Sequence, residues 1–138
     1  MYTMMEACRE TDMTYQALKF YCNEGLVPNV KRDKNNRRVF DERDVKWIRD
    51  LVCLKKCGMS IQEMKAYLDL CLQGPSTIPA RKEMLTKKQE DLRRSIQELE
   101  ESVAYIDWKQ NFYDEVLSGK RPYVSNLIRT WSASFKIV

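Results

Sequence analysis

The 138-residue chain contains no histidine, and this absence already narrows its function. Histidine is a common general base near neutral pH and the most common metal ligand in proteins. Every catalytic triad built on an imidazole is therefore excluded. No other nucleophile–base pair is recognisable in the sequence. We expect a binding protein rather than an enzyme, with no cofactor and no metal site.

Long apolar runs are also missing. No segment approaches the roughly 18 consecutive apolar residues of a membrane-spanning helix, and the N-terminus lacks the basic start and apolar core of a signal peptide. We expect a cytoplasmic protein with no membrane partner. Its five cysteines are then expected to be reduced thiols rather than a disulfide framework.

Helix-breaking residues are scarce: the chain has four glycines and four prolines, so long segments can stay helical. The net charge is only +4, but the basic residues are concentrated between positions 30 and 40. That short stretch contains Lys31, Arg32, Lys34, Arg37 and Arg38 against one acid, Asp33. Such a run is either a solvated face or a surface for a polyanion.

The N-terminal segment predicts two short helices joined by a polar turn. The first covers residues 2–9, and Thr14 is suited to cap the second, which Gly25 ends. Two such helices form a helix-turn-helix. Their inward residues are expected to be Met4, Met5, Cys8, Ala17, Leu18 and Tyr21.

A strand, a turn and a second strand are expected over residues 30–40, because Asn35 and Asn36 tolerate the positive φ of a hairpin tip. This hairpin is a two-stranded basic wing. Asp41 then caps a third helix that ends at Gly58, and Ser60 with Glu63 forms a capping box for a fourth. Residues 74–79 are the clear hinge.

No glycine or proline interrupts residues 80–117, and apolar residues recur there at coiled-coil spacing. A helix of roughly 35 residues is about 50 Å long, too long to be covered by a domain of residues 1–75. A second copy of the chain is the expected partner; packing onto the tail 123–138 is the alternative. The residues expected to form this dimer contact, here called the seam, are Leu85, Leu92, Ile96, Leu99, Val103 and Ile106, with Gln89, Gln110 and Tyr113 at equivalent positions.

The predicted fold is therefore mainly α: a winged helix-turn-helix followed by a long coiled-coil dimerisation helix. We expect a DNA-binding domain at 1–75, the dimerisation helix at 76–118 and a short tail at 119–138 that packs near the end of the coil. The second helix of a helix-turn-helix enters the major groove. Glutamine can pair with an adenine edge, and basic side chains hold phosphates. The candidate DNA contacts are Thr14, Tyr15, Gln16, Lys19, Phe20, Tyr21, Arg37 and Arg38.

Three tracts resemble the MerR family of bacterial regulators. Residues 14–28 match the pattern Ser/Thr-x-x-Thr-Leu-Arg-Tyr-Tyr-Glu-x-x-Gly-Leu-Ile/Val-Pro, residues 35–45 match its wing and the helix that follows, and residues 58–65 match its Gly-hydrophobic-Ser-Leu-x-Glu-Ile-Lys element. The chain departs from the family at Lys19, Cys22 and Arg37, which replace arginine, glutamate and an aromatic residue. Lysine keeps the charge but loses the planar fork of arginine.

The resemblance implies a homodimer joined by an antiparallel coiled coil on promoter DNA. It also implies that the activated dimer bends and untwists an overlong promoter spacer, which affects RNA polymerase indirectly. Deforming such a site costs several kcal/mol, of order 1–6 by elastic estimates.

Residues 47–60 resemble the NmlR/AdhR branch of this family, whose members respond to aldehydes and other thiol-reactive electrophiles through one cysteine. Cys53 occupies that position, with Lys55 and Lys56 nearby to favour its thiolate. The alternative is that Cys53 is a small buried hydrophobic residue. Cys57 could act as a resolving thiol. A metal site formed by Cys53, Cys57 and Cys71 is a further alternative, but the sequence offers no histidine to complete it.

Two other hypotheses stay open. An aromatic group at the end of the long helix could bind a small apolar effector, which would make cysteine sensing unnecessary, or could simply pack the tail. The chain could also be a coiled-coil interaction adaptor that no longer binds DNA. The aromatic group consists of Tyr105, Trp108, Phe112, Tyr113 and Trp131.

Overall fold

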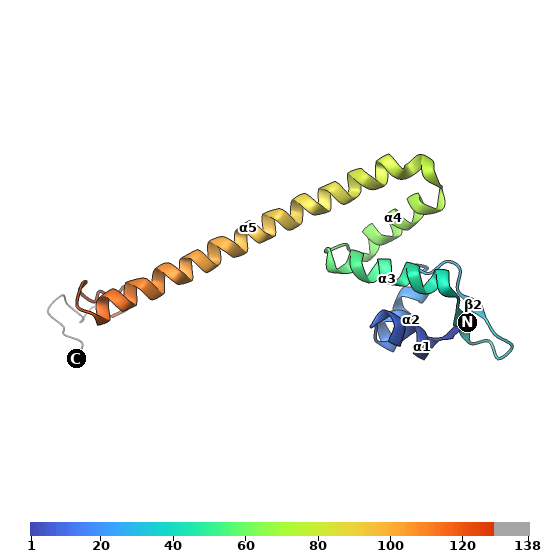
Figure 1. The fold of residues 1–138 in the computed structure, drawn as a ribbon, viewed down its shortest axis with the longest axis horizontal. Helices are drawn as coiled ribbons and strands as arrows, with labels where there is room; N and C mark the ends of the chain where they lie inside the picture. Colours follow the sequence, from blue (N-terminus) through green and yellow to red (C-terminus); the bar gives the residue numbers. More distant parts are fainter. Residues whose placement is uncertain (129–138) are drawn as a thin grey trace. The chain divides into compact units, whose positions relative to one another are not determined.

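A computed structural model describes residues 1–128 of the chain and shows a mainly helical protein with a long C-terminal helix (Figure 1). It divides into two compact units, residues 1–92 and 93–138. The first unit therefore includes the first part of the long helix. The elements are β1 (Tyr2–Thr3), α1 (Met4–Thr11), α2 (Tyr15–Asn23), β2 (Lys31–Arg32), β3 (Arg38–Phe40), α3 (Glu42–Lys56), α4 (Ile61–Leu72), the short 3-10 helix η1 (Pro75–Thr77) and α5 (Ile78–Leu117).

Side-chain caps fix where the helices begin. Thr14 accepts a hydrogen bond from the Ala17 N–H at the start of α2. Asp41 caps α3 and Ser60 caps α4, each in a reciprocal capping box. These three caps confirm the expected helix starts. A fourth cap, Thr3 in a capping box with Glu6, begins α1 and was not anticipated, because residues 2–3 were expected to be helical.

Left-handed glycines end two of these helices. Gly25 has φ +78° and Gly58 has φ +90°. In both cases the next residue donates its backbone N–H to a carbonyl five residues earlier, Leu26 to Tyr21 at 3.0 Å and Met59 to Leu54 at 3.1 Å. This Schellman arrangement needs a positive φ, which residues other than glycine adopt only with strain. It turns the chain sharply into the wing and into α4.

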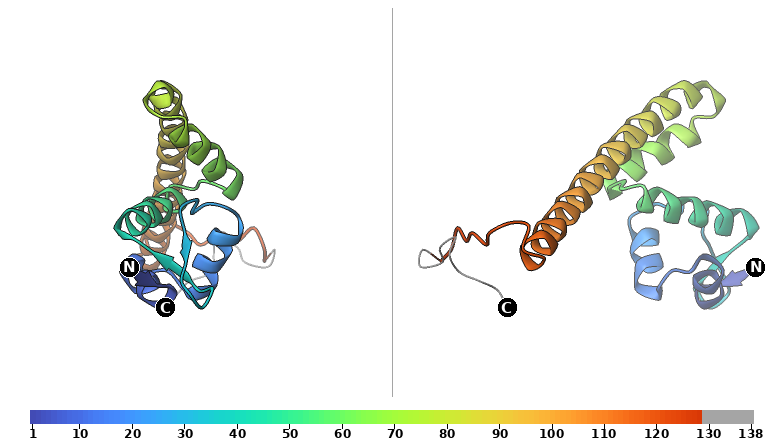
Figure 2. Two further views of the ribbon diagram at one scale, coloured as in Figure 1. Left: turned by 90° about the vertical axis from the view of Figure 1, so that its right-hand side faces the viewer. Right: turned by 60° about the vertical axis from the view of Figure 1, so that its left-hand side comes forward.

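The sheet has three antiparallel strands in the order β1-β3-β2, not the two that were expected. Residues 2–3 pair with 39–40, and residues 31–32 pair with 38–39. At the hairpin tip Asn36 takes φ +60°, and an Asp33 carboxylate oxygen accepts the N–H groups of Asn35 and Arg37. The extra strand attaches the wing to the start of α1 (Figure 2).

One hydrophobic core holds the first unit together. Met5 is 63% exposed, which contradicts its expected inward position, whereas Cys8 is buried. The reason is the start of α1: with Thr3 as its cap, Ala7, Cys8 and Thr11 form the inner face. The largest fully buried side chains are Tyr21, Phe40, Leu18, Leu26, Ile48, Leu51, Met64 and Val45.

The long helix α5 begins at Ile78, within the segment 76–118 expected for it, with Pro79 at its second position, where the missing N–H is not needed. Its seam is exposed in the single chain: the exposed fractions run from 38% at Leu92 to 66% at Leu99. Within residues 1–128 no helix combines the length and apolar character needed to cross a membrane.

Candidate nucleic-acid interface

The helix α2 presents a polar and aromatic surface to solvent. The hydroxyl of Thr14 is engaged as the cap, 3.1 Å from the Ala17 nitrogen, and its side chain stays exposed. Tyr15 and Phe20 are 46% and 47% exposed. Gln16 and Lys19 are exposed as well. Five of the six candidate contacts on this segment are therefore accessible to a duplex.

Tyr21 is the exception. Its side chain is only 2% exposed and belongs to the hydrophobic core. Its hydroxyl has no hydrogen-bond partner in the structure, and burial raises the pKa of the phenol. The expectation that Tyr21 contacts DNA is corrected: helical spacing places it on the same face as Leu18, which points into the core.

The wing is tied to α2 through Arg38. An Nη2–H of Arg38 donates to the Asn23 Oδ1 at 2.6 Å, which joins β3 to the last residue of α2. Arg37 beside it is exposed. Arg32 donates to the backbone carbonyl of Asn36 at 2.9 Å and so braces the hairpin. Arg38 thus positions the wing as well as contributing charge, while Arg37 is free to reach outward.

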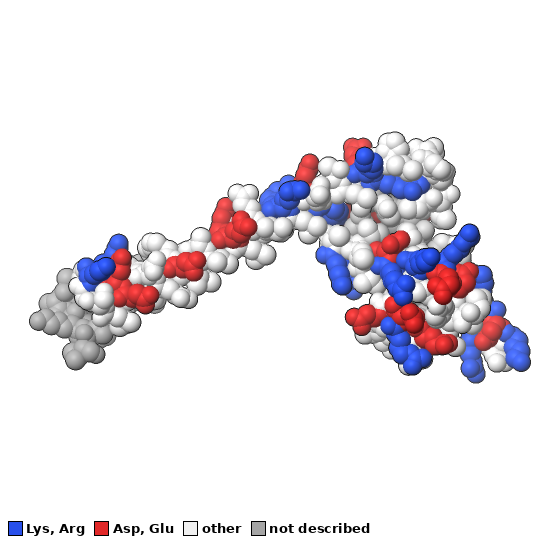
Figure 3. Space-filling view, in the orientation of Figure 1, with Lys and Arg blue, Asp and Glu red and all other residues white. Residues whose placement is uncertain are grey.

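A groove of about 380 Å³ lies between the wing and the starts of α1 and α2. Tyr15 lines one side and the arginines at 32, 37 and 38 line the other, with Met4 and Met5 at the α1 end. The structure therefore brings Tyr15, Arg37 and Arg38 together. Gln16 and Lys19 do not line this groove. In the view of Figure 3, basic side chains gather at the tip of the wing.

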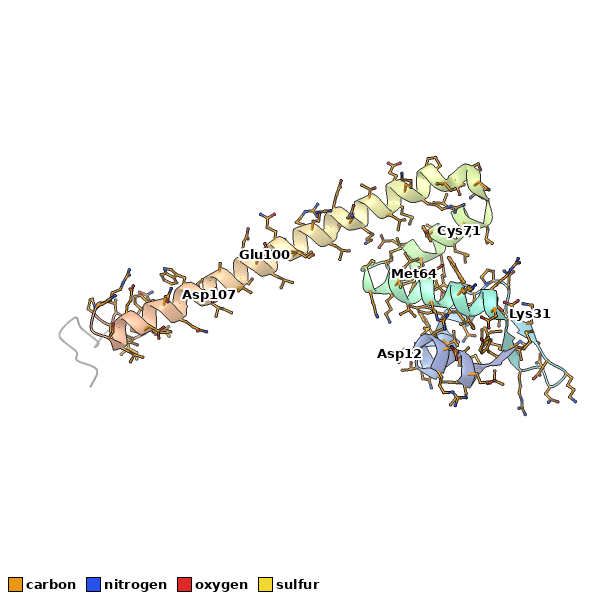
Figure 4. All side chains as sticks on the ribbon, in the orientation of Figure 1. Asp12, Lys31, Met64, Cys71, Glu100 and Asp107 are labelled. Atoms are coloured by element: carbon orange, nitrogen blue, oxygen red, sulfur yellow. The ribbon has the colours of Figure 1, made fainter. Side chains whose placement is uncertain are left out.

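Lys31 contributes less to this surface than its place in the basic run suggests. Its Nζ lies 2.8 Å from an Asp41 oxygen and 3.5 Å from an Asp44 oxygen, beside the first turn of α3 (Figure 4). The hydrogen bond from Lys31 and the backbone N–H of Asp44 lower the pKa of Asp41 to about 2, from an ordinary value of 3.8. The hydrogen bond to Asp41 also raises the pKa of Lys31.

A second surface beside α2 lies at the α3–α4 corner, which comprises residues 57–60. A hollow of about 280 Å³ there is lined by Ala17 and Phe20 of α2 together with Lys55 and Ser60. Lys55 therefore lies beside the exposed face of α2. The sequence marked Lys55 only as a neighbour of Cys53, because the turn at Gly58 that brings it to α2 cannot be seen in local periodicity.

The five cysteines are free thiols in different surroundings. Cys53 is exposed, so the alternative in which it is a buried hydrophobic residue is wrong for the single chain. Cys8 is buried and Cys22 half-buried, and burial raises the pKa of both thiols. Cys71 lies near the end of α4 (Figure 4). No group of three potential metal ligands occurs among residues 1–128.

The aromatic residues of the second unit form a continuous row along α5. Ring centroids are 6.3 Å apart for Tyr105 and Trp108, 5.9 Å for Trp108 and Phe112, and 5.8 Å for Phe112 and Tyr113. The Lys109 ammonium lies 5.4–5.8 Å from three of these rings. Trp131, the fifth member of the expected group, lies outside the described residues.

Comparison with known proteins identifies the architecture. Residues 2–71 match the model of the MerR HTH family regulatory protein, and residues 45–108 match the MerR DNA-binding model. The chain belongs to the MerR family. The expectation of a transcription regulator rather than an enzyme is confirmed, because the family and the relatives are DNA-binding transcription regulators.

Relatives support the branch as well as the family. An HTH-type transcriptional regulator of Haemophilus influenzae is 32% identical over 114 residues, 83% of this chain and 84% of the relative. AdhR of Bacillus subtilis is 33% identical over 87 residues, 63% of this chain and 62% of AdhR. HiNmlR, a MerR family regulator lacking the sensor domain and solved bound to promoter DNA, superposes with a TM-score of 0.70 at 31% identity, covering 85% of this chain and 93% of HiNmlR. These relatives confirm the resemblance to the NmlR/AdhR branch.

Proposed function

We propose that this MerR family regulator works as a homodimer that binds an inverted repeat in promoter DNA, with α2 in the major groove and the wing on the adjacent backbone. The observation that carries the proposal is the groove between Tyr15 and the wing arginines, beside an exposed face of α2. The DNA-bound structure of HiNmlR supports it by similarity. The proposed contacts are Thr14, Tyr15, Gln16, Lys19, Phe20, Arg37 and Arg38, with Lys55 added from the structure.

The exposed seam of α5 supports the dimer. Ile96, Leu99, Val103 and Ile106 are between 52% and 66% exposed in one chain, and burying apolar surface of this kind stabilises association by about 25 cal/mol per Å². The heptad spacing matches that of a two-stranded coiled coil. A second copy of α5 offers the complementary surface.

The charge along α5 supports an antiparallel arrangement. Residues 78–94 contain six basic and three acidic side chains, whereas residues 95–117 contain one basic and six acidic. A parallel pair would set like charges side by side, and an antiparallel pair sets the basic half of each helix beside the acidic half of its partner. Such a dimer carries two DNA-binding domains, here called reading heads, and suits a symmetric operator.

The activated dimer is proposed to bend and untwist the promoter spacer and thereby to act indirectly on RNA polymerase. The signal is proposed to reach Cys53, because this thiol is exposed and sits in the tract that resembles the NmlR/AdhR branch. The exposed aromatic row of Tyr105, Trp108 and Tyr113 favours a second candidate signal, a small apolar effector.

A duplex selected from a random-sequence pool tests DNA recognition. The wild-type protein should enrich an inverted repeat, and its affinity should fall steeply with salt, because each phosphate contact contributes a slope of about −0.9 in log affinity against log salt. Arg37→Ala should weaken binding roughly tenfold and reduce that slope by about one. Lys82→Ala, which removes a lysine from α5, is the matched control. No enrichment, with a dimer still formed, would favour the adaptor alternative.

The signal is tested with a reporter driven by the selected duplex and with formaldehyde as the electrophile. Cys53→Ser should abolish induction and leave duplex affinity unchanged, whereas Cys57→Ser should still respond. Normal induction in Cys53→Ser would assign Cys53 a structural role. Trp108→Ala tests the second candidate signal. Loss of induction in Trp108→Ala but not in Cys53→Ser would assign the signal to the aromatic row.

A further inference from the structure

The first turns of α5 belong to the same compact unit as the DNA-reading elements, and one lysine there reaches the α3–α4 corner. The Nζ of Lys88 lies 3.0 Å from a Glu63 carboxylate oxygen and donates to the backbone carbonyl of Gly58 at 3.3 Å. The Lys88 side chain is only 18% exposed. Lys88 is therefore largely buried and has two partners, one on α4 and one in the turn before it.

Glu63 connects Lys88 to the start of α4. One of its carboxylate oxygens accepts the backbone N–H of Ser60 at 3.1 Å, while the Ser60 hydroxyl accepts the Glu63 N–H at 3.1 Å. The hydrogen bond from Lys88 and the one from Ser60 both lower the pKa of Glu63. Lys88 therefore acts on the carboxylate that caps α4, and through it on the first turn of that helix.

The same helix is joined to α2. The Nζ of Lys65, two residues after Glu63, lies 2.7 Å from a carboxylate oxygen of Glu24. Glu24 is the C-cap of α2, directly before the left-handed Gly25 that ends the helix. Between the two ion pairs, Met64 is buried at 1% exposure in the core that α2 and α4 share. A helix packed in this way moves as a body.

We propose that Lys88 is a positioning residue that couples α5 to α2 through α4, so that the placement of α2 on DNA depends on the placement of the long helix. The connection runs from Lys88 to Glu63, along α4, and from Lys65 to Glu24. The inference rests on the proposed function, in which α5 joins the two reading heads. It assigns the coupling to two ion pairs between elements that are distant in the sequence.

The ion pairs are suited to transmit geometry rather than to stabilise the fold. The side chains of Lys65 and Glu24 are 34% and 35% exposed, and that of Glu63 is 39% exposed. Pairs that retain this much solvent contact contribute little to the stability of a protein. Removing one should therefore leave the chain folded and dimeric while changing how α2 is held.

The test uses the full-length dimer and a duplex selected from a random pool by the wild-type protein, labelled with a donor and an acceptor dye at its two ends. Energy transfer at saturating protein reports the bend of the DNA independently of affinity. Lys88→Met should change the transfer efficiency of the complex and weaken affinity by threefold to tenfold. Lys87→Met, which removes the neighbouring exposed lysine, should leave the bend as in the wild type.

Lys65→Met should change the bend in the same direction as Lys88→Met. The double variant should change it no further than either single variant, because the two pairs act in series. A bend in Lys88→Met equal to that of Lys87→Met and the wild type would overturn the proposal. So would independent, additive effects of Lys88→Met and Lys65→Met.

Solution mass and thermal midpoint verify that each variant is a folded dimer. If Lys88→Met does not fold, Glu63→Gln replaces it, because glutamine at this position keeps the capping box while losing the charge. The same changed bend in Glu63→Gln supports the coupling, and an unchanged bend overturns it. A wild-type protein that selects no duplex would overturn the proposed function and the inference with it, a result distinct from a wild type that binds and variants that bend DNA as it does.

Discussion

The two units of the chain differ in how their apolar residues are covered. In residues 1–92 the large side chains Leu18, Phe40 and Ile48 are fully buried by other parts of the same chain. In residues 93–117 the apolar side chains Leu99 and Val103 are 66% and 59% exposed. The first unit has a buried core of its own, although the seam residues Leu85 and Leu92 within it are 40% and 38% exposed. The second unit presents apolar residues at the regular spacing of a coiled coil. This difference supports the proposal that a second copy of the chain covers the seam.

Removing a core side chain of the first unit should have the largest effect on stability, because that unit depends on its own buried residues. Phe40→Ala is expected to lower the free energy of unfolding by about 3–5 kcal/mol, since it leaves a cavity beneath the sheet. Urea denaturation measures the loss. Val39→Ala, at the half-buried neighbouring position, should cost clearly less; equal losses would mean that Phe40 does not anchor the core.

Introducing charged residues at the seam should prevent dimerisation while the first unit stays folded. The pair Leu99→Glu and Val103→Glu is expected to dissociate the dimer and to weaken duplex affinity by roughly a hundredfold or more, because two linked reading heads become one. The control pair Gln97→Glu and Ala104→Glu adds the same charge on α5 away from the seam. Solution mass and a binding titration distinguish the seam variant from the control variant. A seam variant that is still a dimer would contradict the assigned dimer contact.

Acid should destabilise the first unit through the carboxylates that its cations and backbone groups hold. The pKa of Asp41 is about 2 when folded, against an ordinary 3.8. Its stabilising contribution is therefore complete above about pH 4 and is lost as the pH falls towards 2. The free energy of unfolding, measured across this range, should fall less steeply in Asp41→Asn than in the wild type. Asp69→Asn, an exposed carboxylate of α4, is the control, and identical slopes in both variants would contradict the assignment.

Tyr21→Phe should have the smallest effect and sharpens the boundary between core and DNA surface. Because the buried hydroxyl has no partner, its removal is expected to raise stability by up to about 1 kcal/mol. Duplex affinity should not change, since the side chain is 2% exposed. A clear loss of affinity, with Tyr15→Phe as the exposed comparison, would restore Tyr21 to the DNA contacts.

Local signals in the sequence were sufficient to predict where α2, α3 and α4 begin. Thr14, Asp41 and Ser60 begin helices where capping chemistry predicts, Gly25 and Gly58 follow their ends, and the long helix lies within the segment 76–118. Each of these features depends on residues within five positions of one another. Neighbouring residues therefore carry the information that defines these boundaries.

Contacts between distant segments could not be predicted in this way. The strand at residues 2–3 exists because it pairs with residues 39–40, and Lys31 is held by Asp41 across the start of α3. The approach of Lys55 to α2 likewise depends on how the helices pack. For the candidate site, composition and periodicity identified side chains that prove to be exposed, such as Tyr15 and Arg37, and tertiary packing decided which of them share a groove.

Sedimentation equilibrium of the wild-type chain, alone and with the selected duplex, tests the central claim most directly. The account predicts a species of two chains at micromolar concentration and two chains on each duplex. A single chain at that concentration, and one chain per duplex, would contradict it.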